Sequence, residues 1–181
     1  MSPGPPRVLL LTGPPGIGKT TAMRRIASGL AGRALGGFTT AEIREKGVRV
    51  GFALESFDGA RAVLAHVGIP SPHRVGRYGV DLAALARFAA SALDPAARPD
   101  LYLVDEIGKM ECLSSCFIRL AETLLDSGKI VVATVARQGE GLIREVKGRP
   151  DSLLVEVTPA NRQLLPDELV RWLEKRLAVN R

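Results

Sequence analysis

The amino-acid sequence predicts an α/β fold with three layers, in which helices cover both faces of a largely parallel central sheet that carries a β-hairpin extension. Short apolar runs typical of buried strands alternate along the chain with segments of helical periodicity, as in parallel α/β sheets. A glycine-rich segment, residues 13–20, lies between the first predicted strand and the first predicted helix, as it does in P-loop NTPase folds. The length of 181 residues suits one ordinary domain, so we expect a single P-loop NTPase domain over residues 1–181.

The first third of the chain predicts a strand, a helix and a hairpin. Residues 7–11 form a short apolar run, and residues 20–30 have a helical periodicity that ends before Gly32. Residues 38–43 and 48–54 follow as two strands, joined by a turn that contains Glu45, Lys46 and Gly47.

The middle of the chain predicts two helices and a buried strand. Residues 58–66 have helix-like periodicity, and residues 70–79 resemble a loop because they are rich in proline, glycine and arginine. Residues 81–93 predict a strong helix, with Asp81 as its N-cap and one apolar stripe. An apolar run at residues 101–104 then predicts a buried strand.

The last third predicts a further helix, two strands and a closing helix. Ser114 or Ser115 caps a helix that runs to Asp126, with Gly128 beyond its end. Buried strands are then expected at residues 129–134 and 153–157, and an amphipathic helix at residues 166–177.

The glycine-rich segment matches the phosphate-binding pattern G-x-x-x-x-G-K-[ST]. Its residues are Gly13, Pro14, Pro15, Gly16, Ile17, Gly18, Lys19 and Thr20, and Thr21 follows them. Glycines let backbone N–H groups approach a triphosphate closely, and the N-terminus of the following helix adds partial positive charge. We expect Lys19 to reach the β- and γ-phosphates and the Thr20 hydroxyl to bind Mg²⁺.

Polar residues follow several predicted strands at their carboxyl ends. They include Asp105 with Glu106, Thr134, and the segment 158–162. Ligands of open α/β sheets bind at this edge, so we expect these residues and the phosphate-binding loop to surround one crevice.

The pair Asp105 and Glu106 predicts a Walker-B site. Asp105 would hold Mg²⁺ together with Thr20, while Glu106 would orient or deprotonate an attacking water. The alternative is that both acids cap the next helix. Glu111 is a less favoured base, because an acid in the first turn of a helix is stabilised by the dipole.

Three further residues are candidates with open alternatives. Lys109 could neutralise charge on the γ-phosphoryl group, hold Glu106 by a salt bridge, or be solvated. Thr134 could contact the γ-phosphate or the water, or satisfy backbone groups at the end of its strand. Arg137 lies in a mobile-looking loop and either supplies charge to the transition state or is solvated.

Asn161 and Arg162 are candidates for contacts with the nucleotide base. An amide offers both a donor and an acceptor, and a guanidinium can stack on a ring. The alternative is that Asn161 caps a helix.

Composition limits the function classes. The net charge is +6, but arginines are scattered and aromatic residues make up only 4%, so nucleic-acid binding is possible without being expected. No apolar run is long enough for a membrane helix, and no secretory signal is visible. The two cysteines, Cys112 and Cys116, lack further metal ligands nearby, which favours reduced structural thiols and a cytoplasmic location.

The motifs together resemble the small P-loop nucleoside-triphosphate phosphatases known from thermophiles, whose animal relative is the cancer-related nucleoside-triphosphatase. The resemblance spans nearly the whole chain and includes residues 13–20, 37–44, 47–52, 74–80, 105–111, 133–134 and 161–162. It implies Mg²⁺-dependent release of the γ-phosphate from ATP, GTP, CTP and UTP with little base selectivity. It also implies a second nucleotide-binding stretch, formed by Leu101, Tyr102, Leu103, Val104, Asp105, Glu106, Ile107 and Gly108.

Two other functions use the same phosphate-binding loop. One is a nucleotide or small-molecule kinase, whose acceptor could bind near residues 74–78. The other is a nucleotide-dependent switch or RNA-handling module. A monomer suffices for every residue assigned above, so we expect a monomer.

Overall fold

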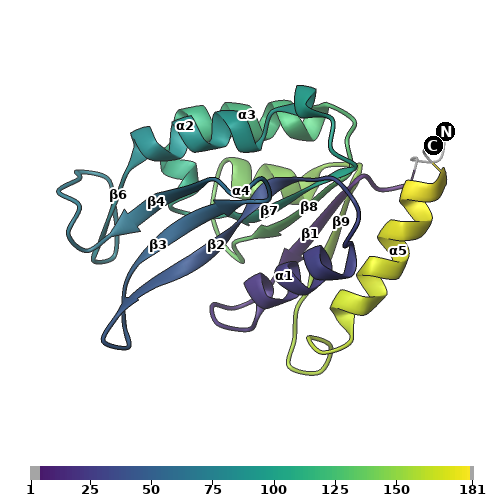
Figure 1. Ribbon diagram of the computed structural model, residues 1–181, viewed down its shortest axis with the longest axis horizontal. Coiled ribbons are helices and arrows are strands. Elements are labelled where there is room, and N and C mark those ends of the chain that lie inside the picture. The colour runs from purple at the N-terminus through teal and green to yellow at the C-terminus, as the bar shows by residue number, and fades with distance from the viewer. Residues whose placement is uncertain (1–4, 180–181) are drawn as a thin grey trace.

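The computed structural model describes residues 5–179, which form one mixed sheet between two layers of helices (Figure 1). The strands are β1 (Val8–Thr12), β2 (Leu35–Glu45), β3 (Val48–Ser56), β4 (Arg61–His66), β5 (Arg74–Val75), β6 (Tyr78–Val80), β7 (Leu101–Ile107), β8 (Val131–Val135) and β9 (Ser152–Glu156). The helices are α1 (Lys19–Gly29), α2 (Leu82–Ala92), α3 (Ser115–Asp126), α4 (Leu142–Glu145) and α5 (Leu165–Val179). Short 3₁₀ turns lie at Pro95–Ala97, Glu111–Leu113 and Val146–Gly148.

The expectation of a largely parallel sheet is wrong for half of it. The strand order is β5-β6-β4-β3-β2-β7-β8-β1-β9. One half of the sheet is parallel and consists of β2, β7, β8, β1 and β9. The other half is antiparallel: β3 pairs with β2, and β4, β6 and β5 follow in that order. The predicted hairpin exists as β2 and β3, but it continues the central sheet, and further antiparallel strands extend it.

Strand β4 corrects the helix predicted at residues 58–66. Gly59 turns the chain with a φ of +92°, and Ser56 and Asp58 hydrogen bond within this turn. Residues 61–66 then pair antiparallel with β3, across a register shift between Phe52 and Ala53. That shift gives β4 two adjacent buried residues instead of strict alternation, so its pattern resembles a helix. Within the predicted loop 70–79, β5 and the start of β6 also form a small antiparallel pair.

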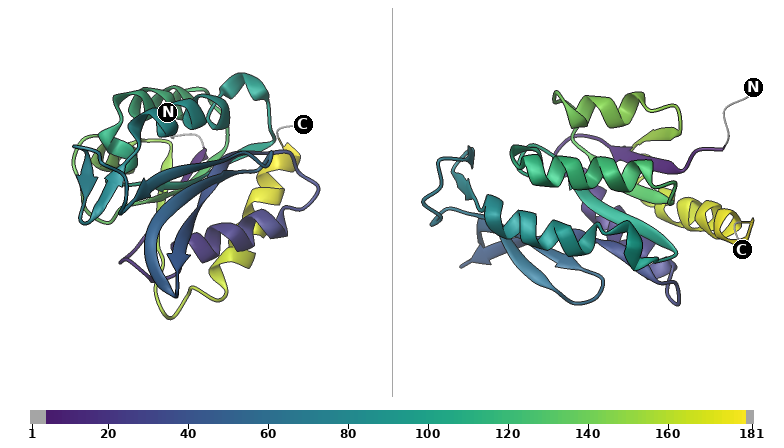
Figure 2. Two further views of the ribbon diagram at one scale, coloured as in Figure 1. Left: turned by 60° about the vertical axis from the view of Figure 1, so that its left-hand side comes forward. Right: turned by 90° about the horizontal axis from the view of Figure 1, so that it is seen from above.

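Two apolar cores lie on opposite faces of the sheet. Helices α2, α3 and α4 cover one face, where Phe38 contacts Phe88 and Phe117 edge to face. Helices α1 and α5 cover the other face and pack on alternate residues of β1, such as Leu9 and Leu11. Figure 2 shows α2 and α3 side by side over the sheet. The three predicted layers are therefore present.

The N-terminal caps of α2 and α3 are the ones that the sequence predicts. The Asp81 carboxylate accepts a hydrogen bond from the Ala84 N–H, and the Ser114 hydroxyl accepts one from the Phe117 N–H, so both predicted N-caps are confirmed.

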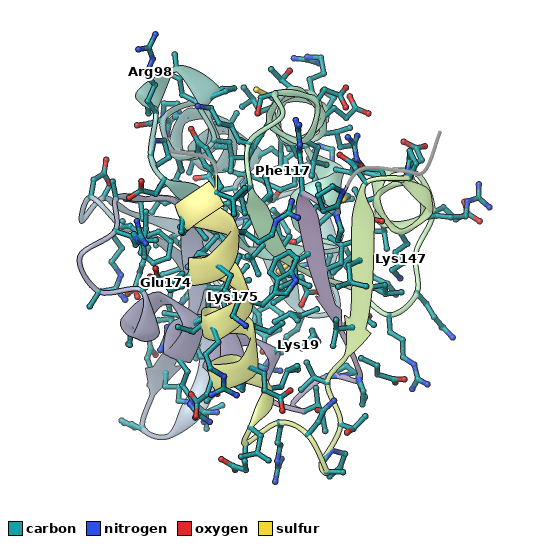
Figure 3. The ribbon with its side chains drawn as sticks, turned by 90° about the vertical axis from the view of Figure 1, so that its right-hand side faces the viewer. Lys19, Arg98, Phe117, Lys147, Glu174 and Lys175 are labelled. Carbon is teal, nitrogen blue, oxygen red and sulfur yellow. The ribbon has the colours of Figure 1, made fainter. Side chains whose placement is uncertain are left out.

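The last strand, β9, differs from the expectation of a buried strand, because it forms the edge of the sheet beside β1 (Figure 3). Leu153 and Leu154 are 42% and 45% exposed there.

Candidate active site

The phosphate-binding loop connects β1 to α1 through glycines that need special backbone angles. Gly16 and Gly18 have φ of +76° and +111°. A side chain at Gly13 would place its Cβ 2.9 Å from the Val157 carbonyl oxygen. Lys19 begins α1 and turns back over the loop, where its Nζ donates to the Gly13 carbonyl at 3.1 Å. The loop is thus shaped to present its backbone N–H groups and the ammonium of Lys19 to an anion.

Asp105 lies inside β7, only 1% exposed, and its carboxylate is held from several sides. The Thr134 hydroxyl donates to Oδ1 at 2.6 Å, and the Thr40 N–H donates to Oδ2 at 3.4 Å. Burial raises the pKa of Asp105, while hydrogen bonds from Thr134, Thr20 and Thr40 and the charge of Lys19 oppose this rise. Sequence reasoning missed Thr40, whose contact depends on the parallel pairing of β2 with β7.

Glu106, the next residue, faces the phosphate-binding loop. Its Oε2 lies 3.7 Å from the Lys19 Nζ, and its side chain is 31% exposed. Burial raises the pKa of Glu106, Lys19 lowers it, and the neighbouring Asp105 raises it again. A carboxylate with a raised pKa, beside a cation and open to the cleft, is suited to accept a proton from water.

Glu111 is buried behind this pair, at 5% exposure. Gly108 separates the two glutamates, since a Cβ added there would lie 2.9 Å from an oxygen of each. Burial raises the pKa of Glu111 to about 8, and Glu106 and Asp105 contribute to the rise. A group that is mostly neutral at pH 7 is a poor general base, which agrees with the lower preference for Glu111.

The cysteines lie in different elements and are free. Cys112 belongs to the 3₁₀ turn before α3, and Cys116 belongs to α3 itself. Burial raises the pKa of the Cys112 thiol to about 12. Such a thiol is unreactive at neutral pH, consistent with a structural role.

Lys109 and Arg137 both line the cleft from its rim. Among residues 5–179, the ion pair of Glu106 runs to Lys19 and not to Lys109. The Arg137 guanidinium lies 3.7 Å from Glu156 of β9. The loop that carries Arg137 is tied down, because the Lys147 Nζ (Figure 3) donates to the carbonyls of Ala136 and Arg137 at 2.7 and 2.9 Å.

The phosphate-binding loop, Asp105, Glu106, Lys109 and Arg137 surround one cleft, as expected for the carboxyl ends of the strands, but Thr134 and the segment 158–162 do not line it. Its volume is about 1210 Å³. Thr134 is fully buried beneath it, and its hydroxyl is used by Asp105. The tip of the β2–β3 hairpin projects from the same edge of the sheet as the loop before α1 (Figure 1).

A smaller hollow of about 260 Å³ lies on the other side of the phosphate-binding loop. It is lined by Gly16, Ile17, Gly18, Thr21, Arg25, Arg162 and Gln163. Arg162 thus stands where a base could lie. Asn161 uses its amide within its own loop: its Oδ1 accepts from the Thr158 N–H at 2.8 Å, and its Nδ2 donates to the Glu156 carbonyl at 2.9 Å. Its contact with a base stays a prediction.

Five of the residues assigned to nucleotide binding by resemblance are buried strand residues. They are Leu101, Tyr102, Leu103, Val104 and Ile107, each at most 2% exposed. Their side chains belong to the two cores and do not line the cleft. Their assignment to the nucleotide-binding stretch therefore stays a prediction, and in the structure they form the buried part of β7 that carries Asp105 and Glu106.

Comparison with known proteins identifies the family of this chain. A family model described as NTPase matches residues 8–170. The chain belongs to the NTPase family. Relatives include nucleoside-triphosphatase THEP1 of Thermotoga sp. (strain RQ2), 40% identical over 92% of this chain and 95% of that protein. Another is the cancer-related nucleoside-triphosphatase of Homo sapiens, 38% identical over 89% and 94%.

Two solved structures of the NTPase family share the fold. The crystal structure of THEP1 from Aquifex aeolicus superimposes with a TM-score of 0.82 at 31% identity, over 92% of this chain and 99% of that one. The solution structure of the human cancer-related nucleoside triphosphatase gives 0.79 at 34% identity, over 93% and 98%. Within residues 5–179, no helix combines the length and the apolar character required to span a bilayer.

Proposed function

We propose that this member of the NTPase family is an Mg²⁺-dependent nucleoside-triphosphatase that hydrolyses the γ-phosphate of ATP, GTP, CTP and UTP. The observation that carries the proposal is the meeting of Lys19 and Glu106, 3.7 Å apart, at the phosphate-binding loop beside the buried Asp105. The names of the relatives support the reaction class.

The residues beside the loop fit a magnesium ion. Asp105 offers a buried carboxylate and Thr20 a hydroxyl hydrogen-bonded to it, and Mg²⁺ prefers oxygen ligands. Phosphate oxygens and water would supply the remaining ligands, because Mg²⁺ usually keeps several waters and is held by one or two protein groups. Bound there, Mg²⁺ would neutralise charge on the β- and γ-phosphates.

The chain's own residues supply the remaining steps. Glu106 orients a water whose oxygen bonds to the γ-phosphorus, as the bond from phosphorus to the bridging β–γ oxygen breaks. The proton of the water passes to the Glu106 carboxylate, and nucleoside diphosphate and phosphate leave. Lys19 stabilises the charge on the transferred group. Lys109 and Arg137 reach it from the rim once their side chains reorient.

Weak base selectivity follows from where the contacts lie. The phosphate-binding loop, Lys19 and the metal ligands all recognise the phosphates. The hollow on the base side offers the planar Arg162 and the exposed Thr21, which suit any flat ring.

The decisive experiment measures phosphate release from the four triphosphates with and without Mg²⁺. Wild type should release phosphate from all four only with Mg²⁺. Glu106→Gln should keep nucleotide binding and lose roughly 100-fold or more in kcat, the range for a positioned general base. Lys19→Ala should also bind nucleotide more weakly. Undiminished turnover in Glu106→Gln would reject the assigned base, and full activity of Lys19→Ala would reject the assigned site.

The same assay separates the other functions. Nucleoside diphosphate formed only when an acceptor is added would indicate a kinase. Turnover that requires RNA or a protein would indicate a switch. A cytoplasmic location and a monomeric state belong to the proposal, and a sedimentation experiment tests the latter.

A further inference from the structure

The cleft extends beyond the space that the phosphates of one nucleotide need. Ligand pockets typically measure about 300–1000 Å³, and this cleft measures about 1210 Å³. In the proposed function, the base lies in the separate hollow beside Arg162, so a triphosphate leaves the opposite part of the cleft free. That part is walled by β2, β3 and β6, which β7 and β8 separate from the phosphate-binding loop at β1.

The walls of this distal part combine aromatic rings with arginines. Phe52 and Tyr78 meet edge to face, with ring centroids 5.2 Å apart. The Arg49 guanidinium lies 5.1 Å from the Phe52 ring and 5.9 Å from the Tyr78 ring, and its Nε donates to the Tyr78 hydroxyl at 3.1 Å. Phe52, Tyr78 and Arg49 all line the cleft. Such a wall suits a flat, electron-rich ring.

The same wall carries positive charge that a ligand can reach. Glu42 accepts from Arg49 at 2.9 Å and pairs with Arg44 at 2.6 Å, so one carboxylate faces two guanidinium groups. The two arginine side chains are 44% and 55% exposed, and exposed ion pairs of this kind hold each other weakly. Arginine binds phosphate in a bidentate manner, so a phosphate can replace Glu42 as their partner.

We propose that Arg44, Arg49, Phe52 and Tyr78 form a second binding site, which takes a nucleoside 5′-monophosphate while a triphosphate occupies the phosphate-binding loop. The base packs against Phe52 and Tyr78, and the phosphate binds Arg44 and Arg49. The orientation of the triphosphate rests on the proposed function. The site therefore makes the protein a two-nucleotide binder.

The test is equilibrium dialysis of radiolabelled GMP or UMP against protein saturated with Mg²⁺ and a β,γ-imido triphosphate analogue. One monophosphate per chain should bind beside the analogue. Phe52→Ala should weaken this binding about tenfold, the scale of one base–aromatic stack. Arg49→Lys, which keeps the charge but loses the planar fork, should weaken it as well. Arg61→Lys is the matched control, because Arg61 pairs with Glu55 and does not line the cleft.

Several outcomes would overturn the second site. They are displacement of the monophosphate by the analogue, retention of full affinity in both Phe52→Ala and Arg49→Lys, and absence of binding at millimolar monophosphate. Displacement by a short single-stranded RNA at much lower concentration would assign the wall to RNA instead. Arg49 is exposed, so Arg49→Lys remains informative if Phe52→Ala unfolds. Failure of the analogue itself to bind would contradict the proposed function, which separates the two hypotheses.

Discussion

Replacing Glu111 by Gln tests the energetic cost of the buried carboxyl group behind the active site. Folding raises the pKa of Glu111 from an ordinary 4.5 to about 8, chiefly because the group is buried and also because Glu106 and Asp105 lie nearby. Between these two values the folded protein binds one more proton than the unfolded chain. Its free energy of unfolding must therefore fall as the pH rises.

The expected size follows from that difference in pKa. One extra proton changes the free energy of unfolding by about 1.4 kcal/mol per pH unit, so wild type should lose roughly 3–4 kcal/mol between pH 5 and pH 8 through this group. Glu111→Gln has a similar shape and no titration. The variant and wild type should be similar in stability near pH 5, and the variant should be several kcal/mol more stable at pH 8.

Urea unfolding at pH 5, 6, 7 and 8 in the presence of EDTA measures this difference. Subtracting the free energy of unfolding of the variant from that of wild type at each pH removes the contributions of the other titrating groups. Glu140→Gln, which changes an exposed carboxylate in the loop before α4, is the matched control. A pH-independent difference for Glu111→Gln would refute the reasoning. An increase in the stability of wild type relative to the variant toward pH 8 would also refute it, because that would indicate a paired, ionised carboxylate.

Three further substitutions test the site and the core. Thr134→Val removes the 2.6 Å hydrogen bond to Asp105 and should raise the Mg²⁺ concentration needed for half-maximal phosphate release; an unchanged Mg²⁺ titration would contradict that role. Lys147→Met frees the loop carrying Arg137 and should lower kcat severalfold, whereas the exposed Lys175→Met should not; equal rates in both would show that the loop needs no anchor. Phe117→Ala should cost about 3–5 kcal/mol in urea unfolding, since the ring is fully buried against Phe38, and a loss below about 1 kcal/mol would mean the core refills the space.

Features governed by neighbours in the chain were predictable from the amino-acid sequence. The phosphate-binding loop needs glycines at Gly16 and Gly18, where φ is positive, and a helix directly after them. The caps at Asp81 and Ser114 each join a side chain to a backbone N–H three residues on. These interactions close within one turn, so the motif carries most of the information.

Features that join distant segments required the tertiary structure. Residues 61–66 form a strand because they pair with β3, and β9 is partly exposed because it is the edge strand of the sheet that residues 5–179 form. The partners of Asp105 come from β2 and β8, and their approach depends on strand register.

Local motifs in the sequence therefore identify the chemical groups of the site, but they do not determine the environment of those groups. The sequence shows that Glu106 and Glu111 are both carboxylic acids near Asp105, the proposed metal ligand. Only packing makes one of them a half-open group beside Lys19 and the other a buried acid with a pKa of about 8. Burial and distance set these properties, and both arise from contacts between segments that lie far apart in the chain.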